Sequence, residues 1–450
     1  MFSRFRNFIT QDRFLIGVSL LRICIGLIIL YQYLIHYGQR YFLFSAEGVM
    51  PFYEGQHDWS LYHLSPSLTY FDIIYHLGIV VSFIYLLGFK GRIFTVLNFV
   101  FYYSLYQRYG HISDGGDNIL IICMFYLMFA NNTAYFSLDH ARFKRYREAN
   151  KGTLCYQFSA MLHNFAVLFC IVQLCILYFF SGMYQLMGEL WHNGTAIYYI
   201  SQVKEFSRPL LRYLVEEHLW LTIIITYFTM WIKIAFPFTI LNKKLKPFIV
   251  AAMVTFHLGI CIGMGLLTFS VIMIILEFLV FTDKEYRNGW IRMNRFARKL
   301  QYFLMRTGRV WGKRRLAPYQ IIVFYDGWCP MCRRIMRSFR RLDYFGLLKF
   351  ASFRNPQIIV RYGLVPQEVE KRMHSMKVAS VDKKKVGIHS IVQICTRLVP
   401  LWPLVPFLYL SEKIGIGSVV YDYIASKRNL IPVNHCGNDF CDLPQATIGR

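Results

Sequence analysis

Long apolar runs alternate with short basic segments in the first two thirds of the chain. A helix that crosses a bilayer needs about 20 apolar residues. The pattern predicts such spans at 14–36, 70–89, 92–108, 117–136, 162–185 and 218–238. A further apolar run, Phe248 to Phe281, is too long to cross a hydrocarbon core of about 30 Å as one helix. It predicts two helices that meet near Gly263 and Gly265. We therefore expect a multi-pass, all-α membrane bundle of about eight helices over residues 1–283.

Basic residues occupy alternate connections between these spans. They are Arg4, Arg6 and Arg13, then Lys90 and Arg92, then RFKRYREANK at 142–151 and NKKLK at 242–246. Because cytoplasmic loops are enriched in Lys and Arg, both termini are expected in the cytoplasm. The first apolar run is too long for a signal peptide and lacks a small-residue cleavage site, so it predicts a retained span.

A basic segment at 284–318 connects the predicted bundle to the rest of the chain. Apolar residues recur in it every three or four positions, with Arg and Lys between them. They are Trp290, Met293, Phe296, Leu300 and Phe303. This spacing is typical of an amphipathic helix on the inner leaflet. The alternative is a helix packed on the domain that follows.

From residue 319 the pattern changes to that of a small α/β domain, 319–450. IIVFYDG predicts a buried strand, CPMCRRIMRSFRRLD a helix and LLKFASF a second strand. A polar helix near 366–374, a hairpin in MKVASVDKKKVGIHS that turns at KKK, and an apolar helix at 391–398 complete the series. This order of elements is that of a thioredoxin-like domain.

Composition supports a membrane protein. Hydrophobic residues make up 56% of the chain and charged residues 17%, against roughly 25% charged in soluble domains. The formal net charge is +25. Basic residues beside apolar spans are what membrane orientation and anionic headgroups require, so we expect membrane lipids as partners and no nucleic acid.

The motif YDGWCPMC, Tyr325 to Cys332, carries the clearest chemistry. A helix N-terminus favours an anion, so Cys329 is expected to be the exposed thiolate and nucleophile. Cys332, one turn further, would resolve the mixed disulfide. Asp326 is expected either to cap the helix or to accept a proton during exchange, or else to be a turn residue before Gly327.

Structural zinc is the alternative for a Cys-x-x-Cys pair. Cys436 and Cys441 in HCGNDFC have a spacing that would complete a four-thiolate site. Zinc-binding pairs usually lie on turns, whereas Cys329 and Cys332 open a predicted helix. The redox interpretation is therefore preferred, with no metal. In it, Cys436 and Cys441 would relay electrons to or from the first pair.

The segments VFYDGWCPMCRRIMRSFRRLD and VVYDYIASKRN resemble the DCC family of thiol-disulfide oxidoreductases. That family is named for an Asp-x-x-Cys-x-x-Cys motif, which Asp326, Cys329 and Cys332 match. The resemblance covers residues 320 to about 445 and implies a redox dithiol. A peptide or protein dithiol would then be the substrate.

Ionisable residues inside spans are functional candidates because burying them in lipid is costly. They are Arg22, Asp72, His76, Asp117, Lys233, His257 and Glu277. Arg22 is expected to pair with an acid, Glu277 or Asp117. His76 and His257 are more typical of hydrogen-bonded core residues than of ligands.

Three segments carry a second resemblance: GGDNILIICMFYLMFANNTAYFSLD, LYFFSGMYQLMGELWHNGTAIYYI and FHLGICIGMGLLTFSVIMI. On these segments, the chain resembles the HTTM family over residues 10–285. These bacterial membrane proteins are similar to the vitamin K-dependent gamma-carboxylase, so the resemblance implies a bacterial cell membrane. The carboxylase has a lysine base in the segment that matches FFSGMYQL. Tyr184 and Gln185 stand there in this chain, and neither is a base near neutral pH. What the resemblance still implies is a cavity for a quinone or an acyl chain. Its expected lining is Asp117, Tyr184, Gln185, Trp191, His192 and His257, and the alternative is that these residues only pack the bundle.

The leading hypothesis is an integral membrane thiol-disulfide oxidoreductase with its dithiol on the cytoplasmic side. It requires no cofactor, a quinone is the candidate cofactor, and the dithiol is expected to be coupled to a quinone, lipid or peptide substrate in the membrane domain. Two alternatives stay open: a non-enzymatic membrane scaffold or transport component with a structural zinc site, and a carboxylase-like membrane enzyme with a displaced base.

Overall fold

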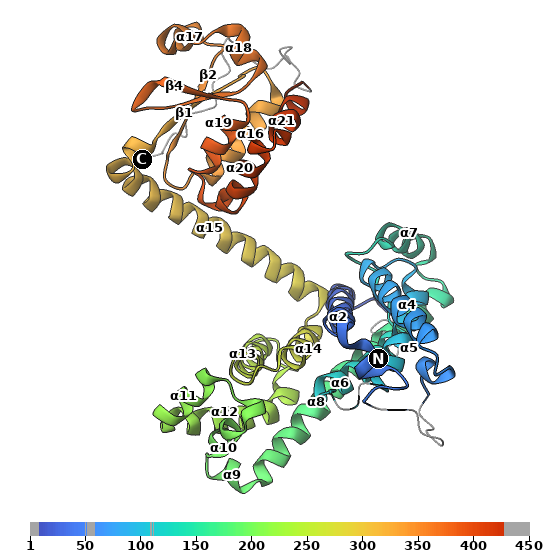
Figure 1. The fold of residues 1–450 in the computed structure, drawn as a ribbon. Helices are drawn as coiled ribbons and strands as arrows, with labels where there is room; N and C mark the ends of the chain where they lie inside the picture. The colour runs from blue at the N-terminus through green and yellow to red at the C-terminus, as the bar shows by residue number, and fades with distance from the viewer. Residues whose placement is uncertain (1–8, 50, 52–58, 109, 111, 427–450) are drawn as a thin grey trace. The chain divides into compact units, whose positions relative to one another are not determined.

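The computed structural model describes residues 9–49, 51, 59–108, 110 and 112–426. It is mostly helical and divides into two compact units, Met1–Trp290 and Ile291–Arg450. Figure 1 shows the helices of the first unit and the small sheet of the second. The division falls inside one helix, α15 (Asp283–Arg315), which covers most of the predicted linker 284–318.

Five helices in the described part of the chain are long and apolar enough to cross a membrane. They are α2 (Leu15–Ile35), α4 (Leu68–Leu87), α8 (Leu154–Met187), α12 (Leu219–Thr239) and α13 (Lys246–Met264). Three further helices lie at predicted spans but are shorter: α5 (Gly91–Tyr106), α6 (Gly115–Leu127) and α14 (Leu267–Glu277). A membrane protein is thus supported, but the expected eight spans are not confirmed. The span expected at 117–136 fails because α6 ends at Leu127.

The first unit also contains short helices in its loops. They are α3 (Arg40–Phe44), α7 (His140–Asn150), α9 (Glu189–His192), α10 (Ala196–Gln202) and α11 (Pro209–Glu217). α7 is formed by the basic segment RFKRYREANK with the two residues before it, and α9 to α11 lie in the loop between α8 and α12. Each is far shorter than the roughly 20 residues that a span requires.

The predicted break in the long apolar run is confirmed. α13 ends at Met264 and α14 begins at Leu267, with Gly265 at the C-cap of α13. Gly265 has a φ of 81°, in the left-handed region that glycine adopts without strain. The chain therefore reverses where the sequence offers the residue that permits it.

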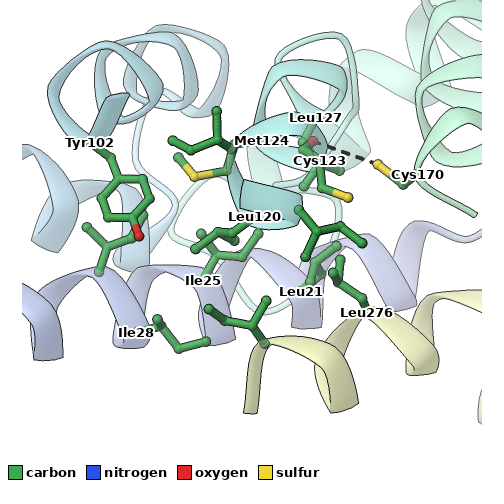
Figure 2. Packing of buried hydrophobic residues seen from close by; sticks show 14 of the residues in the cluster. Leu21, Ile25, Ile28, Tyr102, Leu120, Cys123, Met124, Leu127, Cys170 and Leu276 are labelled. Carbon is green, nitrogen blue, oxygen red and sulfur yellow. Dashed lines mark hydrogen bonds between the residues drawn. The ribbon is translucent and has the colours of Figure 1, made fainter. Parts of the chain in front are cut away.

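The core of the first unit contains side chains from all eight of the helices at predicted spans, among them α2, α6, α8 and α14. Figure 2 shows Leu21, Ile25 and Ile28 of α2 facing Leu120 and Met124 of α6. The Cys170 thiol points at the Cys123 carbonyl oxygen, 3.7 Å away. Both cysteines are buried among apolar residues, where a thiol behaves as a small hydrophobic group.

The basic connections are joined at one end of this unit. Arg147 of α7 forms an ion pair with Asp12, at 3.0 Å, and the backbone N–H of Gly91 donates to Asp139. Lys246 pairs with Glu285 at 2.9 Å, and the Asp283 carboxylate accepts from the first N–H groups of α2. These contacts join the basic connections at residues 91, 140–150 and 246 to one another and to the start of α15, whereas Arg4 and Arg6 lie outside the described residues.

The second unit is built on a four-stranded mixed sheet in the order β2-β1-β3-β4. The strands are β1 (Ile321–Tyr325), β2 (Leu348–Ser352), β3 (His374–Lys377) and β4 (Ser380–Val386). β1 is parallel to β2 and antiparallel to β3, and β3 and β4 form an antiparallel hairpin. The expected order of a strand, a helix, a second strand and a hairpin is confirmed.

Every residue of β1 is buried because helices pack on both faces of the sheet. Ile321, Val323 and Tyr325 pack with α16 (Pro330–Leu342) and α19 (Ile388–Cys395). Ile322 and Phe324 point to the other face, where they pack with α17 (Pro356–Tyr362) and α18 (Pro366–Lys371). α20 (Val405–Lys413) and α21 (Ile416–Ser426) complete the unit. The segment Val399–Lys413, which includes α20, and α21 form an apolar pair bent by 98° that would be a sixth candidate span if counted as one.

Two local expectations for this unit are wrong. The hairpin turns at Val378 and Ala379, and KKK, 383–385, lies within β4. β4 is an edge strand, where lysines protect the free edge from pairing with other strands. The apolar helix begins at Ile388 rather than at residue 391, because Gly387, with φ of 60°, precedes it.

Of the two alternatives for α15, packing on the following domain is present in part of the helix. Trp290, Met293, Phe296 and Phe303 are each more than half exposed. Further along, Gly308 and Gly312 lie against the backbone of residues 344 and 345. The C-terminal part of the helix therefore packs on the second unit.

Candidate active site

The Cys-x-x-Cys motif lies where β1 ends and α16 begins. Cys329 is the N-cap of α16, and its Sγ accepts a hydrogen bond from the backbone N–H of Cys332, at 3.4 Å. Pro330 occupies the first turn, where its fixed φ fits a helix and its missing N–H costs nothing. A sulfur that accepts from a helix N-terminus is stabilised as a thiolate.

The exposure of the two cysteines differs from the prediction made from the sequence. The prediction that Cys329 is the exposed thiol is wrong: its residue is 0% exposed, and Cys332 is 9% exposed. Cys332 lines a cavity, and Cys329 does not. The difference arises because the turn before α16 directs the Cys329 side chain back over the helix start, to the Cys332 N–H.

Asp326 does not cap α16, since Cys329 holds that position. Its carboxylate accepts from the backbone N–H of Trp328, at 2.9 Å, and binds the Arg354 guanidinium. The two residues form a bidentate ion pair, Nε to Oδ1 at 3.0 Å and Nη2 to Oδ2 at 2.8 Å. Asp326 is 1% exposed. It therefore fixes the turn that carries the dithiol.

Arg354 is the site residue that the sequence did not reveal. Its third nitrogen, Nη1, pairs with Glu370, and its guanidinium lies 4.3 Å from the centre of the Trp328 ring. The hydrogen bonds that Arg354 donates to Asp326, together with the charge of that carboxylate, raise the pKa of Arg354 above its ordinary value. Arg354 follows β2, the parallel neighbour of β1, so its place at the carboxyl end of the sheet was the available signal.

A cavity of about 460 Å³ lies beside the motif, between α16 and the C-terminal helices. Met331, Cys332 and Ile335 of α16 form one wall. Ile416 and Val420 of α21 belong to the opposite wall. Its volume falls within the roughly 300–1,000 Å³ typical of small-molecule sites.

Cys436 and Cys441 lie outside the described residues, so the predicted relay and the four-thiolate zinc site are not tested. Within the part of the chain that is described, no three His, Cys, Asp or Glu side chains are grouped as metal ligands would be.

In the first unit, Asp117 is buried at the start of α6. It is the partner of Asp114 in a capping box, and its Oδ1 also accepts from Gln32, at 2.8 Å, and Tyr102, at 3.1 Å. Three donors thus hold this carboxylate: one from α2, one from α5 and the backbone N–H of Asp114, the N-cap of α6. These bonds account for a carboxylate buried in an apolar bundle.

His257 belongs to a buried polar cluster with Tyr178 and Glu277. The Tyr178 hydroxyl donates to Glu277 Oε1, at 2.6 Å, and lies 2.9 Å from His257 Nε2. All three residues are at most 1% exposed and come from α8, α13 and α14. Tyr178 was not singled out from the sequence, although it lies in the same segment as Tyr184.

Arg22 does not pair with an acid as expected. Its guanidinium donates to the carbonyl oxygens of Tyr85, Asn132 and Phe136, at 2.9, 3.1 and 2.7 Å, and to that of Leu86. Carbonyl groups at the end of a helix carry partial negative charge, which a buried cation neutralises. Arg22 therefore ties α2 to the end of α4 and to the loop after α6.

The other expected cavity residues lie near the end of α8 and in α9. Tyr184 is 74% exposed, His192 is exposed, and Gln185 and Trp191 are partly buried. The His192 carbonyl accepts from the Tyr227 hydroxyl. The hydrogen bonds of the described residues join Asp117 and His257 to other partners, so they do not gather these six residues into one cluster.

A thiol pair at the start of a helix that follows a buried strand is the arrangement of thiol-disulfide exchange domains. Residues 323–433 match a family model described as DCC1-like thiol-disulfide oxidoreductase. The match includes Asp326, Cys329, Cys332 and Arg354 and supports an oxidoreductase domain here. No curated protein and no solved structure matches the chain.

Proposed function

We propose that this protein is an integral membrane thiol-disulfide oxidoreductase that uses Cys329 and Cys332 as its redox dithiol. The observation that carries the proposal is the hydrogen bond from the Cys332 N–H to the Cys329 sulfur, within the region that matches the oxidoreductase family. That contact favours the thiolate, which is the attacking species in disulfide exchange. The sheet order supports a thioredoxin-like domain.

The proposed roles follow from the surroundings of each group. Cys332, which lines the cavity, is the sulfur that bonds to a substrate, and Cys329, whose sulfur accepts from the helix N-terminus, then attacks Cys332 to complete the exchange. Asp326 and Arg354 position the turn through their ion pair. The relay through Cys436 and Cys441 is a further part of the proposal, to be tested by replacing both with serine.

The dithiol is placed in the cytoplasm in this proposal. The joined basic connections support it, because basic loops favour the cytoplasmic side and α15 starts among them. The five candidate spans, the apolar stripe of α15 and its Arg side chains support membrane lipids as partners. The membrane half is proposed as an HTTM-like domain of a bacterial cell membrane.

Thiol trapping tests the function directly. Membranes that contain the full-length protein are equilibrated at defined glutathione potentials, and free thiols are then labelled with a mass-tagged maleimide. We expect Cys329 and Cys332 to gain and lose labels together, and Cys329→Ser or Cys332→Ser to abolish the paired change. Cys395→Ser is the matched control, because Cys395 is buried in the same unit and should not affect the pair.

Two results would contradict the proposal. One is a pair that stays reduced across the whole range of potentials. The other is one equivalent of zinc in the purified protein that is lost in Cys329→Ser, which would support a zinc scaffold instead.

A further inference from the structure

The cavity beside Cys332 has mainly apolar walls. On α16 the lining residues Met331, Ile335 and Phe339 are four positions apart, so they share one face of the helix. On α21 Ile416, Val420 and Ile424 have the same spacing and face the same cavity. These three are between 46% and 57% exposed. They therefore form the mouth of the cavity as well as part of its wall.

The polar groups in these walls are already bound to the protein. The Ser411 hydroxyl donates to the Leu408 carbonyl, at 2.8 Å. The Tyr421 hydroxyl accepts from the Met373 N–H, at 2.7 Å, and Asp326 holds Arg354. A peptide backbone in this cavity would lose its hydrogen bonds to water and find few replacements, which is unfavourable. The walls therefore favour an apolar small molecule over a polypeptide segment.

The lining also favours a planar ring over a plain hydrocarbon chain. Tyr325, Phe339 and Tyr421 line it with aromatic residues, and Met331 and Met336 contribute polarisable sulfur atoms. Cys332 is the one thiol among the described residues that line the cavity. A ligand in the cavity lies against Cys332, one of the two thiols of the pair. If that ligand can accept two electrons, the dithiol that donates them is beside it.

We propose that this cavity binds the ring of a lipid-soluble quinone and that the quinone oxidises the Cys329 and Cys332 dithiol. The inference rests on the proposed function and adds its electron acceptor. The chain carries its own candidate spans, so an oxidant dissolved in the bilayer is available to it. The mouth is formed by α21 of the bent apolar pair, and exposed apolar surface of this kind is typical of membrane contact.

The reaction is balanced by these three partners. The Cys332 thiolate adds to a ring carbon of the quinone and forms a carbon–sulfur bond. The Cys329 thiolate then attacks the Cys332 sulfur, a disulfide forms, and the carbon–sulfur bond breaks with its electron pair remaining on the ring. The two thiol protons end on the two oxygens of the quinol. The dithiol is thereby oxidised by two electrons and the quinone is reduced by two.

The test uses full-length protein in detergent, reduced and then freed of reductant, with decylubiquinone as the probe. We expect about one quinone reduced per dithiol, as measured by quinone absorbance and by loss of labelled thiols. Val420→Trp should slow this reaction about tenfold or more by filling the mouth. Val419→Trp is the matched control: Val419 is the neighbouring α21 residue, 70% exposed and outside the lining, and its rate should stay within about twofold of the wild type.

Each outcome decides something. Val420→Trp must unfold in urea at the same midpoint as the wild type, which shows that the variant is folded. A dithiol that cycles with glutathione but does not reduce decylubiquinone overturns the quinone assignment and leaves the proposed function intact. Equal quinone rates in both tryptophan variants would show that the quinone reacts elsewhere. Reduction of lipoamide but not of the quinone, with the same sensitivity to Val420→Trp, would make the ligand an alkyl disulfide. A dithiol that cycles with neither partner would overturn the proposed function itself.

Discussion

Arg354 binds the Asp326 carboxylate with two parallel hydrogen bonds, of 3.0 and 2.8 Å, across a gap of 28 residues in sequence. Asp326 is 1% exposed and the Arg354 side chain 13%, so neither charge is well solvated. Trp328 joins them, because its N–H donates to Asp326 and its ring lies over Arg354. The turn before the dithiol therefore depends on a residue from the next strand's end.

Arg354→Met should destabilise the second unit strongly, since it leaves a buried carboxylate without its counter-charge. The expected cost in unfolding free energy is about 3–5 kcal/mol. Urea unfolding of the full-length protein, followed by protease cleavage within the second unit, measures it. Arg361→Met is the control, because Arg361 is an exposed residue of α17, and it should change stability by at most about 0.5 kcal/mol.

The double variant Asp326→Asn with Arg354→Met separates the energy of the ion pair from the loss of stability that each substitution causes by itself. Removing both charges should cost clearly less than the sum of the two single changes, because no unpaired charge is left. Additive costs would contradict the coupling of these two residues.

Gly312→Ala should disrupt the packing of α15 on the second unit. A Cβ at this position would clash with the Phe345 carbonyl oxygen, so either the helix or the loop at residue 345 must move. We expect a loss of stability of roughly 1–3 kcal/mol and faster proteolysis near residue 345. Gly289→Ala, in the same helix with open space around it, should instead stabilise by about 0.5–1 kcal/mol. Equal effects of the two substitutions would contradict this account.

Tyr178→Phe should destabilise the first unit because the Tyr178 hydroxyl joins Glu277 to His257. Loss of a partner for a buried polar group costs about 1–3 kcal/mol. Thermal unfolding in detergent gives the value. Tyr184→Phe makes the same chemical change on the same helix at a residue that is 74% exposed, and it should have little effect. A similar midpoint for both variants would show that the buried cluster does not contribute to stability.

His374 should make the second unit sensitive to mild acid. Burial lowers the pKa of His374, and the hydrogen bond from its Nδ1 to the Arg372 carbonyl opposes this only in part. The unfolded chain, with a histidine pKa of about 6.5, then binds more protons than the folded one. The contribution to stability is complete above that value and is lost as pH falls through the lowered folded value.

Unfolding free energies at about pH 7.5 and about pH 5 check this expectation. The acid-induced loss should be smaller in His374→Gln than in the wild type. It should persist in His389→Gln, because His389 is half exposed and lies beside Glu412. An unchanged loss in His374→Gln would assign the acid sensitivity to other groups.

Features set by neighbouring residues were predictable from the sequence, whereas features set by distant contacts were not. The start of α16 follows from Cys329 and Pro330 in an otherwise helical pattern, and the break after α13 follows from Gly265 in a run too long for one span. The Asp326 and Arg354 pair, the Tyr178 and Glu277 hydrogen bond and the carbonyl partners of Arg22 join residues 28 to 114 positions apart. No periodicity or spacing indicates such pairs. The burial of Cys329 has the same origin, because it depends on how the turn is held.

The hydrogen bond that the Cys329 sulfur accepts comes from the main chain, from the N–H of residue 332. That donor is present whatever side chain stands at 332, and Pro330 supplies no competing N–H. Exchanging neighbouring charged side chains should thus shift the reduction potential only slightly. Changing the curvature of the turn, as Pro330→Gly would, should shift it more. The affinity of this dithiol for electrons therefore depends mainly on the backbone geometry of the first turn of α16.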